Sequence, residues 1–211
     1  MPTAREETQR QTRVRLLAAA NASIVQEGVA ATSIRSICAA AGRTQGAFYS
    51  NFSSKNGLLV DLMELRILEE IALLRGLVSK AAVSDIGEAL RVLTERLARI
   101  AAETESSLLS TELQLHARRD QAFAEHHNAT KATCEVFADL IEDIVTRYDL
   151  KPVLPPLQIG IGLYALWSGM AVQGDVAQAM PRERMLLAFF RAMTGLAPTK
   201  DHSPDVSVSA G

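Results

Sequence analysis

Residues 42–52 read GRTQGAFYSNF, in which small and polar residues directly precede a cluster of aromatic ones. Gly42 ends a short apolar repeat that has the spacing of an amphipathic helix. Thr44 carries a hydroxyl that can cap a second short helix, running to about Asn51. Two short helices joined by a tight turn that contains glycine are typical of a helix-turn-helix, whose second helix enters the DNA major groove.

The polar residues of this stretch are candidates for DNA contact. In a helix-turn-helix, Thr44, Gln45 and Gly46 would face the base edges. The Gln45 amide offers one donor and one acceptor, which suit adenine, and Gly46 lets the backbone approach closely. Tyr49 presents a hydroxyl that can reach a phosphate, and Lys55 adds a charge at the start of the next helix.

The aromatic residues Phe48 and Phe52 are predicted to hold the second helix against its neighbours, because so short an element needs a large buried area to keep its angle. Short helices joined through glycine also occur in helical proteins that do not bind DNA. The two aromatic residues are core in either case, so the pattern alone leaves that alternative open.

Composition restricts the class of protein. The chain has 211 residues, of which 48% are apolar and 22% charged, which is typical of a globular protein. Two cysteines, no signal peptide and no run of 18 apolar residues favour a cytoplasmic protein without a membrane span. Residues 1–60 carry seven basic and three acidic side chains, whereas residues 61–211 carry 15 basic and 21 acidic ones. A basic N-terminal part on an acidic remainder favours phosphate contact at that end.

The hydrophobic pattern predicts an all-α fold, since no segment sustains the alternation of a strand. We expect a three-helix head with helices at about 12–27, 34–41 and 44–51. Six further helices are expected at about 55–80, 85–100, 109–116, 120–148, 157–173 and 182–196. The predicted domains are a DNA-binding head (1–54), a helical body (55–196) and a disordered tail (197–211).

Two segments carry a family resemblance: TRVRLL at 12–17, and QEGVAATSIRSICAAAGRTQGAFYSNFSSKNGLL at 26–59. They resemble the N-terminal domain of the TetR family of bacterial transcriptional regulators (TetR/AcrR type). The resemblance implies DNA contacts for Thr32, Arg35, Thr44, Gln45, Gly46, Tyr49 and Lys55. Arg43 and Gln45 depart from the family pattern, which predicts a base or phosphate preference particular to this chain. Ile24 also departs from it, with an effect on packing alone.

For residues 55–196 the resemblance implies a six-helix body that holds a ligand pocket and joins a second subunit through its last two helices. Small residues that permit close crossing and an apolar stripe are the candidates for that homodimer interface: Gly162, Ala165, Gly169, Met185, Phe189 and Met193. Ordinary core packing is the alternative for these residues. Candidates for the pocket lining are His116, Phe123, Phe137, Trp167 and Met170, and a lining so apolar favours an apolar or aromatic effector.

Other chemistry has less support in the sequence. Glu125, His126 and His127 are adjacent, and neighbouring side chains on a helix point about 100° apart, so no metal site is expected. No GxSxG or GxxxxGK[ST] motif occurs, and neither an enzyme nor a cofactor is expected.

Together these features predict a ligand-responsive homodimeric repressor, which binds a roughly palindromic operator in double-stranded DNA and is released by a small effector. One alternative is a helical small-molecule carrier or enzyme without operator binding. The other is a dimeric interaction protein without a pocket.

Overall fold

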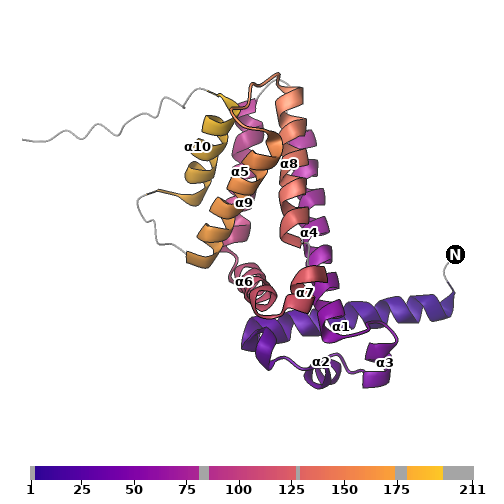
Figure 1. Ribbon diagram of the computed structural model, residues 1–211. Helices are drawn as coiled ribbons and strands as arrows, with labels where there is room; N and C mark the ends of the chain where they lie inside the picture. Colours follow the sequence, from indigo (N-terminus) through magenta and orange to yellow (C-terminus); the bar gives the residue numbers. More distant parts are fainter. Residues whose placement is uncertain (1–2, 81–85, 127–128, 174–179, 197–211) are drawn as a thin grey trace, which may run out of the picture.

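The computed structural model describes residues 3–80, 86–126, 129–173 and 180–196, and the predicted all-α fold is confirmed there (Figure 1). In chain order the helices are α1 (Ala4–Ala31), α2 (Ile34–Ala40), α3 (Gln45–Tyr49), α4 (Lys55–Lys80), α5 (Ile86–Ala102), α6 (Thr104–Arg119), α7 (Gln121–His126), α8 (Ala129–Arg147), α9 (Pro156–Gln173) and α10 (Arg182–Thr194). Helix α1 lies across one end of the molecule, with α2 and α3 on its outer side and the other helices on its inner side. We call α1–α3 the head and α4–α10 the body.

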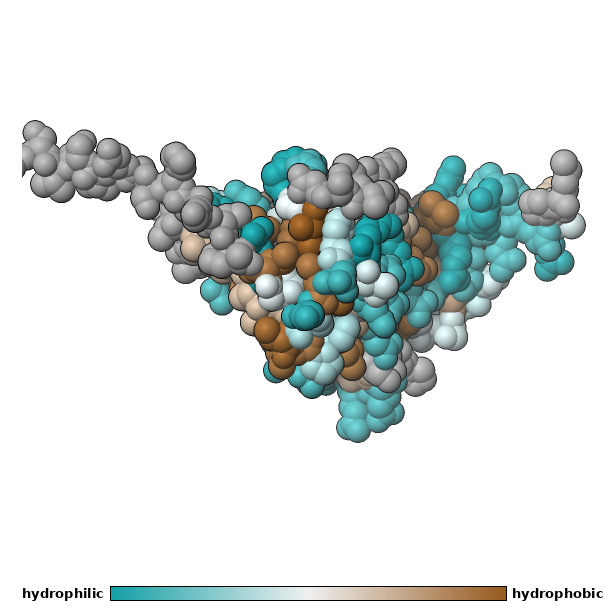
Figure 2. Space-filling view, turned by 90° about the horizontal axis from the view of Figure 1, so that it is seen from above, coloured by the Kyte–Doolittle hydropathy of each residue, from teal (hydrophilic) through white to brown (hydrophobic). Residues whose placement is uncertain are grey.

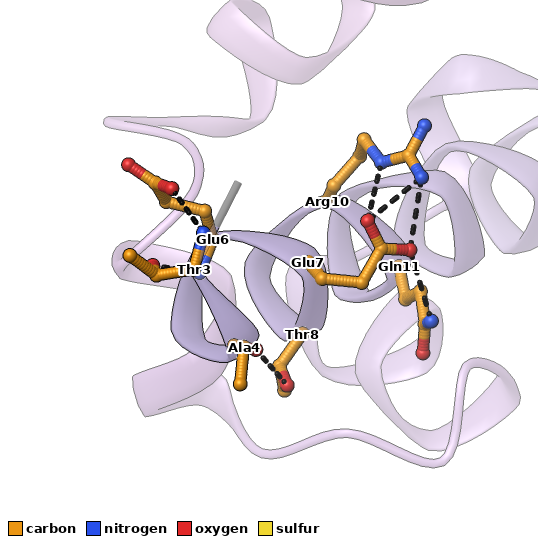
Figure 3. A network of polar contacts seen from close by, with 7 residues as sticks. All are labelled: Thr3, Ala4, Glu6, Glu7, Thr8, Arg10 and Gln11. Carbon is orange, nitrogen blue, oxygen red and sulfur yellow. Dashed lines mark hydrogen bonds and ion pairs between the residues drawn. The ribbon is translucent and has the colours of Figure 1, made fainter. Parts of the chain in front are cut away.

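Helix α1 begins eight residues before the predicted start at Thr12, with Thr3 as its N-cap (Figure 3). The Thr3 hydroxyl accepts from the Glu6 amide at 3.3 Å, and the Thr3 amide donates to the Glu6 carboxylate at 2.6 Å. This capping box satisfies two amides that a helix start leaves open. In the next turn Arg10 pairs with Glu7 at 2.7 Å. These turns are polar, so apolar periodicity could not reveal them.

Near its end, α1 bends at Gly28, whose φ of 82° is costly for any residue with a side chain. A Cβ added at Gly28 would lie 2.9 Å from the Oε2 atom of Glu112 in α6, which is closer than van der Waals contact. The same carboxylate accepts a hydrogen bond of 2.9 Å from the Val29 amide. Helix α6 therefore fixes the bend of α1, and with it the orientation of the head.

Two clusters of buried side chains form the interior. The first lies under the head and includes Leu16, Ile37 and Phe48, but also Leu109 and Leu113 of α6. The second lies within the body between α4, α5, α8, α9 and α10. Leu109 and Leu113 of α6 therefore pack together with residues of the head in one core.

In the body, α6 extends beyond both ends of the helix predicted at about residues 109–116. The segment expected as one helix from about Asp120 to Tyr148 contains α7 and α8, and residues 127–128 between them lie outside the described residues. The Asp120 carboxylate caps α7 by accepting from the Phe123 amide at 2.9 Å. Asp85, His127 and the tail 197–211, about which the sequence made predictions, lie outside the described residues. Within the described ranges, none of the helices has both the length and the apolar character that a membrane crossing requires.

Replacement of Gly28 by alanine is expected to lower the free energy of unfolding by about 1–3 kcal/mol, because alanine is strained at this φ and its Cβ would meet Glu112. Urea unfolding of the purified protein measures the change. Gly76→Ala is the matched control: Gly76 lies inside α4, where an added Cβ meets nothing within 4 Å, so this variant should gain about 0.5–1 kcal/mol. Equal stability of the two variants would contradict the role of Gly28.

Candidate nucleic-acid interface

Helix α3 lies on the outer side of the head, away from the body (Figure 1). Thr44 is its N-cap, and the Thr44 hydroxyl accepts from the Ala47 amide at 3.2 Å. Thr44, Gln45 and Gly46 are exposed, and Tyr49 is 57% exposed. The structure therefore brings these four predicted residues together on one open surface, which we call the tip.

The opposite side of α3 is apolar and buried, as the sequence predicted. Phe48 is fully buried and Phe52 is 4% exposed. The two ring centroids lie 5.5 Å apart, and the Tyr49 ring meets the Phe48 ring edge-on, also at 5.5 Å. Aromatic contacts of this kind fix the angle of a helix that is too short to be stable alone.

Arg13 of α1 supports α3 through contacts that sequence analysis did not anticipate. The Arg13 guanidinium donates to the Asn51 carbonyl at 3.1 Å, forms an ion pair with Asp61 of α4, and lies 4.7 Å from the centre of the Phe52 ring. One side chain thus joins the end of α3 to α1 and α4. An arginine on a polar stretch is ordinarily solvent-exposed, so only its partners far along the chain reveal this role.

Lys55 joins α4 to the connection between α1 and α2. Its ammonium donates to the Val29 and Thr32 carbonyls, each at 2.5 Å. Burial lowers the pKa of the Lys55 ammonium. Two of its three donors are therefore used inside the head, and one is left for the predicted phosphate contact.

The other three predicted DNA contacts differ in exposure. Thr32 is only 2% exposed, and its hydroxyl donates to the Gly28 carbonyl at 2.9 Å. Thr32 therefore caps α1 and is not part of the exposed surface. Arg35 is exposed on α2. Arg43 is half-buried and donates to the Gly42 carbonyl at 3.0 Å.

The body contains a cavity of about 150 Å³ between α4, α5, α6, α8 and α9. Its wall includes residues of both cores: Met63, Leu109 and Leu113 belong to or pack against the head core, and Leu74, Leu97, Phe137, Leu140, Tyr164 and Trp167 belong to or pack against the body core. The lining residues are Met63, Arg66, Glu70, Leu74, Arg75, Leu97, Ile100, Ser106, Leu109, Ser110, Leu113, Val136, Phe137, Leu140, Tyr164 and Trp167.

Of the five side chains predicted to line a pocket, Phe137 and Trp167 line this cavity. Phe123 is fully buried in the head core instead. His116 lies beside it, with ring centroids 4.7 Å apart and its Nε2 atom 3.0 Å from the Asn56 amide oxygen. Burial lowers the pKa of His116. Met170 packs against the body core without lining the cavity.

Some of the residues predicted at a subunit interface pack within the chain. A Cβ at Gly162 would lie 2.9 Å from the Phe189 ring, so these two residues bring α9 close to α10. Ala165 is exposed, whereas Gly169, Met185 and Met193 are half-buried.

Larger exposed apolar residues of α9, which were not singled out from the sequence, lie beside Ala165: Leu157 is 47% exposed, Ile161 50% and Val172 59%. Apolar side chains reach the surface of the part of the body formed by α9 and α10, whereas the start of α1 is polar (Figure 2).

Comparison with known proteins agrees with this architecture. Residues 16–62 match a sequence model described as bacterial regulatory proteins, tetR family. A protein described as a TetR-family transcriptional regulator from Rhodococcus sp. superposes with a TM-score of 0.72 at 19% identity, over 88% of this chain and 99% of that one. The reduced form of NemR from E. coli gives 0.70 at 19% identity, over 89% and 100%.

The fatty acid degradation regulator FadR from Bacillus halodurans has the same fold, with a TM-score of 0.66 at 15% identity over 86% of this chain and 94% of that one. Among curated proteins, none matches the sequence. The N-terminal domain is therefore a tetR-family domain of bacterial regulatory proteins, and the chain has the fold of TetR-family transcriptional regulators.

Proposed function

We propose that this chain is a homodimeric, non-catalytic transcriptional repressor that binds a roughly palindromic DNA operator and is released from it by a small, largely apolar effector. One observation carries the proposal. The tip of Thr44, Gln45, Gly46 and Tyr49 is exposed, and Phe48 on the opposite side of α3 is buried in the core. Both lie within residues 16–62, which match the tetR family.

Different residues of the head would contact the bases and the phosphates of the DNA. Gln45 would read a base edge in the major groove, because its amide can donate and accept together. Arg35 and Tyr49 would contact phosphates and set the register without reading sequence. In a dimer, two such tips would enter successive turns of the major groove, about 34–36 Å apart.

Release from DNA would depend on the contacts between α6 and the head. The Asn21 amide donates to the Glu105 carboxylate at 2.5 Å, and Glu112 holds the bend of α1. Leu109 and Leu113, on the same helix, form part of the cavity wall. A molecule in the cavity that favoured another position of α6 would also favour another orientation of the head, and so reduce DNA affinity.

The dimer would form through α9 and α10. The exposed apolar residues Leu157, Ile161 and Val172 belong to α9, and covering them against a second copy would remove apolar surface from water. A dimer of this kind presents its two heads in a symmetric arrangement, which a palindromic operator requires.

The proposal is tested by fluorescence anisotropy with the duplex that lies upstream of the chain's own gene, at several salt concentrations. We expect salt-dependent binding that is tighter than binding to a scrambled duplex of equal length. Equal affinity for both duplexes would reject operator recognition and favour a small-molecule carrier.

Gln45→Ala is expected to weaken operator binding by about 1–3 kcal/mol while leaving affinity for the scrambled duplex nearly unchanged, because a base contact is lost. Arg35→Gln, at an exposed position of α2, is the comparison variant. This variant should weaken binding to both duplexes. It should also reduce the slope of log affinity against log salt concentration by about one, because one phosphate contact is lost. Equal losses on both duplexes for Gln45→Ala would refute base reading by Gln45.

Lys55→Met is expected to lower the free energy of unfolding by about 1–3 kcal/mol, since it removes two charge-assisted hydrogen bonds to carbonyls of the head. Urea unfolding gives the value. Lys151→Met, at an exposed position between α8 and α9, should change stability by less than about 0.5 kcal/mol. A Lys55 variant as stable as the control would mean that these bonds do not hold the head.

Ile161→Glu is expected to weaken dimerisation by at least about tenfold, because it places an unpaired charge in the proposed apolar interface. Sedimentation across a concentration series measures the dissociation constant. Leu68→Glu alters an apolar residue of α4 that is 64% exposed, so the dimer should persist. Dimerisation unaffected by Ile161→Glu would place the interface elsewhere.

A further inference from the structure

The first turns of α1 continue past the end of α3 (Figure 1), and they precede residues 16–62, which match the tetR family. The Gln9 amide donates to the Ser50 carbonyl at 3.2 Å. One turn later, the Arg13 guanidinium donates to the Asn51 carbonyl at 3.1 Å. Both carbonyls lie at the end of α3, where a helix leaves its carbonyls without partners. One face of α1 is therefore seated on the end of α3.

Arg5 belongs to this same face of α1, because residues four apart on a helix lie one above the other. It precedes Gln9 by one turn, which places it about 6 Å farther along the helix axis, beyond the end of α3. Arg5 is exposed, and none of the described residues forms a hydrogen bond or an ion pair with it. Its guanidinium is therefore available to a partner outside the chain.

The other charged side chains of these turns are engaged within the helix (Figure 3). Glu7 pairs with Arg10 at 2.7 Å. The Glu6 carboxylate accepts from the Thr3 amide at 2.6 Å, where it also offsets the partial positive charge of the helix start. The Glu6 amide donates to the Thr3 hydroxyl in return. An anion at this surface would therefore be met by the Arg5 side chain and not by the capped backbone of the helix end.

The position of Arg5 fits a phosphate group that the tip does not reach. In a helix-turn-helix the N-terminal residues of the second helix face the base edges, so the other end of α3 lies nearer the phosphate backbone that borders the groove. Tyr49, a proposed phosphate contact, is adjacent to Ser50 at that end. Arg5 lies one helical turn farther out. A guanidinium matches the geometry of a phosphate, since it can donate two parallel hydrogen bonds to the phosphate oxygens.

We propose that Arg5 contacts a backbone phosphate of the DNA that flanks each half-site of the operator. The contact lengthens the DNA that the chain binds, but it adds nothing to the base sequence that the chain reads. This inference rests on the proposed function, because it assumes that α3 lies in the major groove.

The test compares two duplexes by fluorescence anisotropy. The long duplex contains the operator and its flanks, and the short one is trimmed at both ends to the outermost base pair whose exchange alters affinity. For the unaltered chain we expect trimming to weaken binding at least about fivefold, because a dimer loses two phosphate contacts. The slope of log affinity against log salt concentration should fall by about two for the same reason.

Arg5→Gln is expected to remove this dependence on the flanks. The variant should bind the long duplex about as weakly as the unaltered chain binds the short one, and its affinity for the short duplex should be nearly unchanged. Arg15→Gln is the matched control, since Arg15 is also an exposed arginine of α1 without a partner among the described residues. Arg15 borders a shallow hollow together with Glu7 and Val14, on another face of the helix. Both variants remove one positive charge, so only the position differs, and the control should keep its dependence on the flanks.

Two results would overturn the proposal directly: no effect of trimming on the unaltered chain, or the same behaviour of the Arg5 and Arg15 variants. An Arg5-dependent gain that changes when flanking A·T pairs are replaced by G·C pairs would also overturn it, because the side chain would then read a groove and not a phosphate.

Failure of the proposed function gives a different result. Equal affinity for the operator and the scrambled duplex rejects operator recognition, and the flank contact with it. Specific operator binding that Arg5→Gln leaves unchanged on the long duplex rejects the flank contact alone, and the proposed repressor stands.

Discussion

The contact between Glu112 and the backbone at Gly28 and Val29 is the constraint on which the arrangement of head and body depends. It occupies the one place in α1 where the chain turns with a positive φ, and it comes from a helix whose other face forms part of the cavity wall. Because the Glu112 carboxylate accepts the hydrogen bond of the Val29 amide, this contact connects α6 directly to the bend of α1. Leu109 and Leu113 of the same helix belong to the head core and line the cavity, so packing and hydrogen bonding both connect α6 to the head.

Local signals predicted the head and the start of the body well. Thr44 caps α3, the Ser54 hydroxyl accepts from the Gly57 amide at 3.0 Å at the start of α4, and the bounds of α4 agree with those predicted. Each of these signals lies within a few residues of the helix end that it sets. Asp120 caps α7, which agrees with the predicted start of a helix near that residue.

The features that sequence analysis missed depend on contacts between residues far apart in the chain. Arg13 and Lys55 are ordinary surface residues by type, and their partners lie 23 to 48 positions away along the chain. Phe137 and Trp167 line the cavity, as does Tyr164, which the sequence analysis did not select. Glu70 was missed, because a glutamate on a long helix carries no sign of burial until α5 supplies Arg96.

The two sides of the short helix α3 differ in role: one packs in the core, and the other carries the proposed DNA contacts. Phe48 on one side is fully buried in the core, and Gln45 on the other is exposed. Exchange of Gln45 for another polar residue should therefore change the stability of the fold little. Descendants of this gene could diverge toward new regulatory targets while their scaffold stays intact.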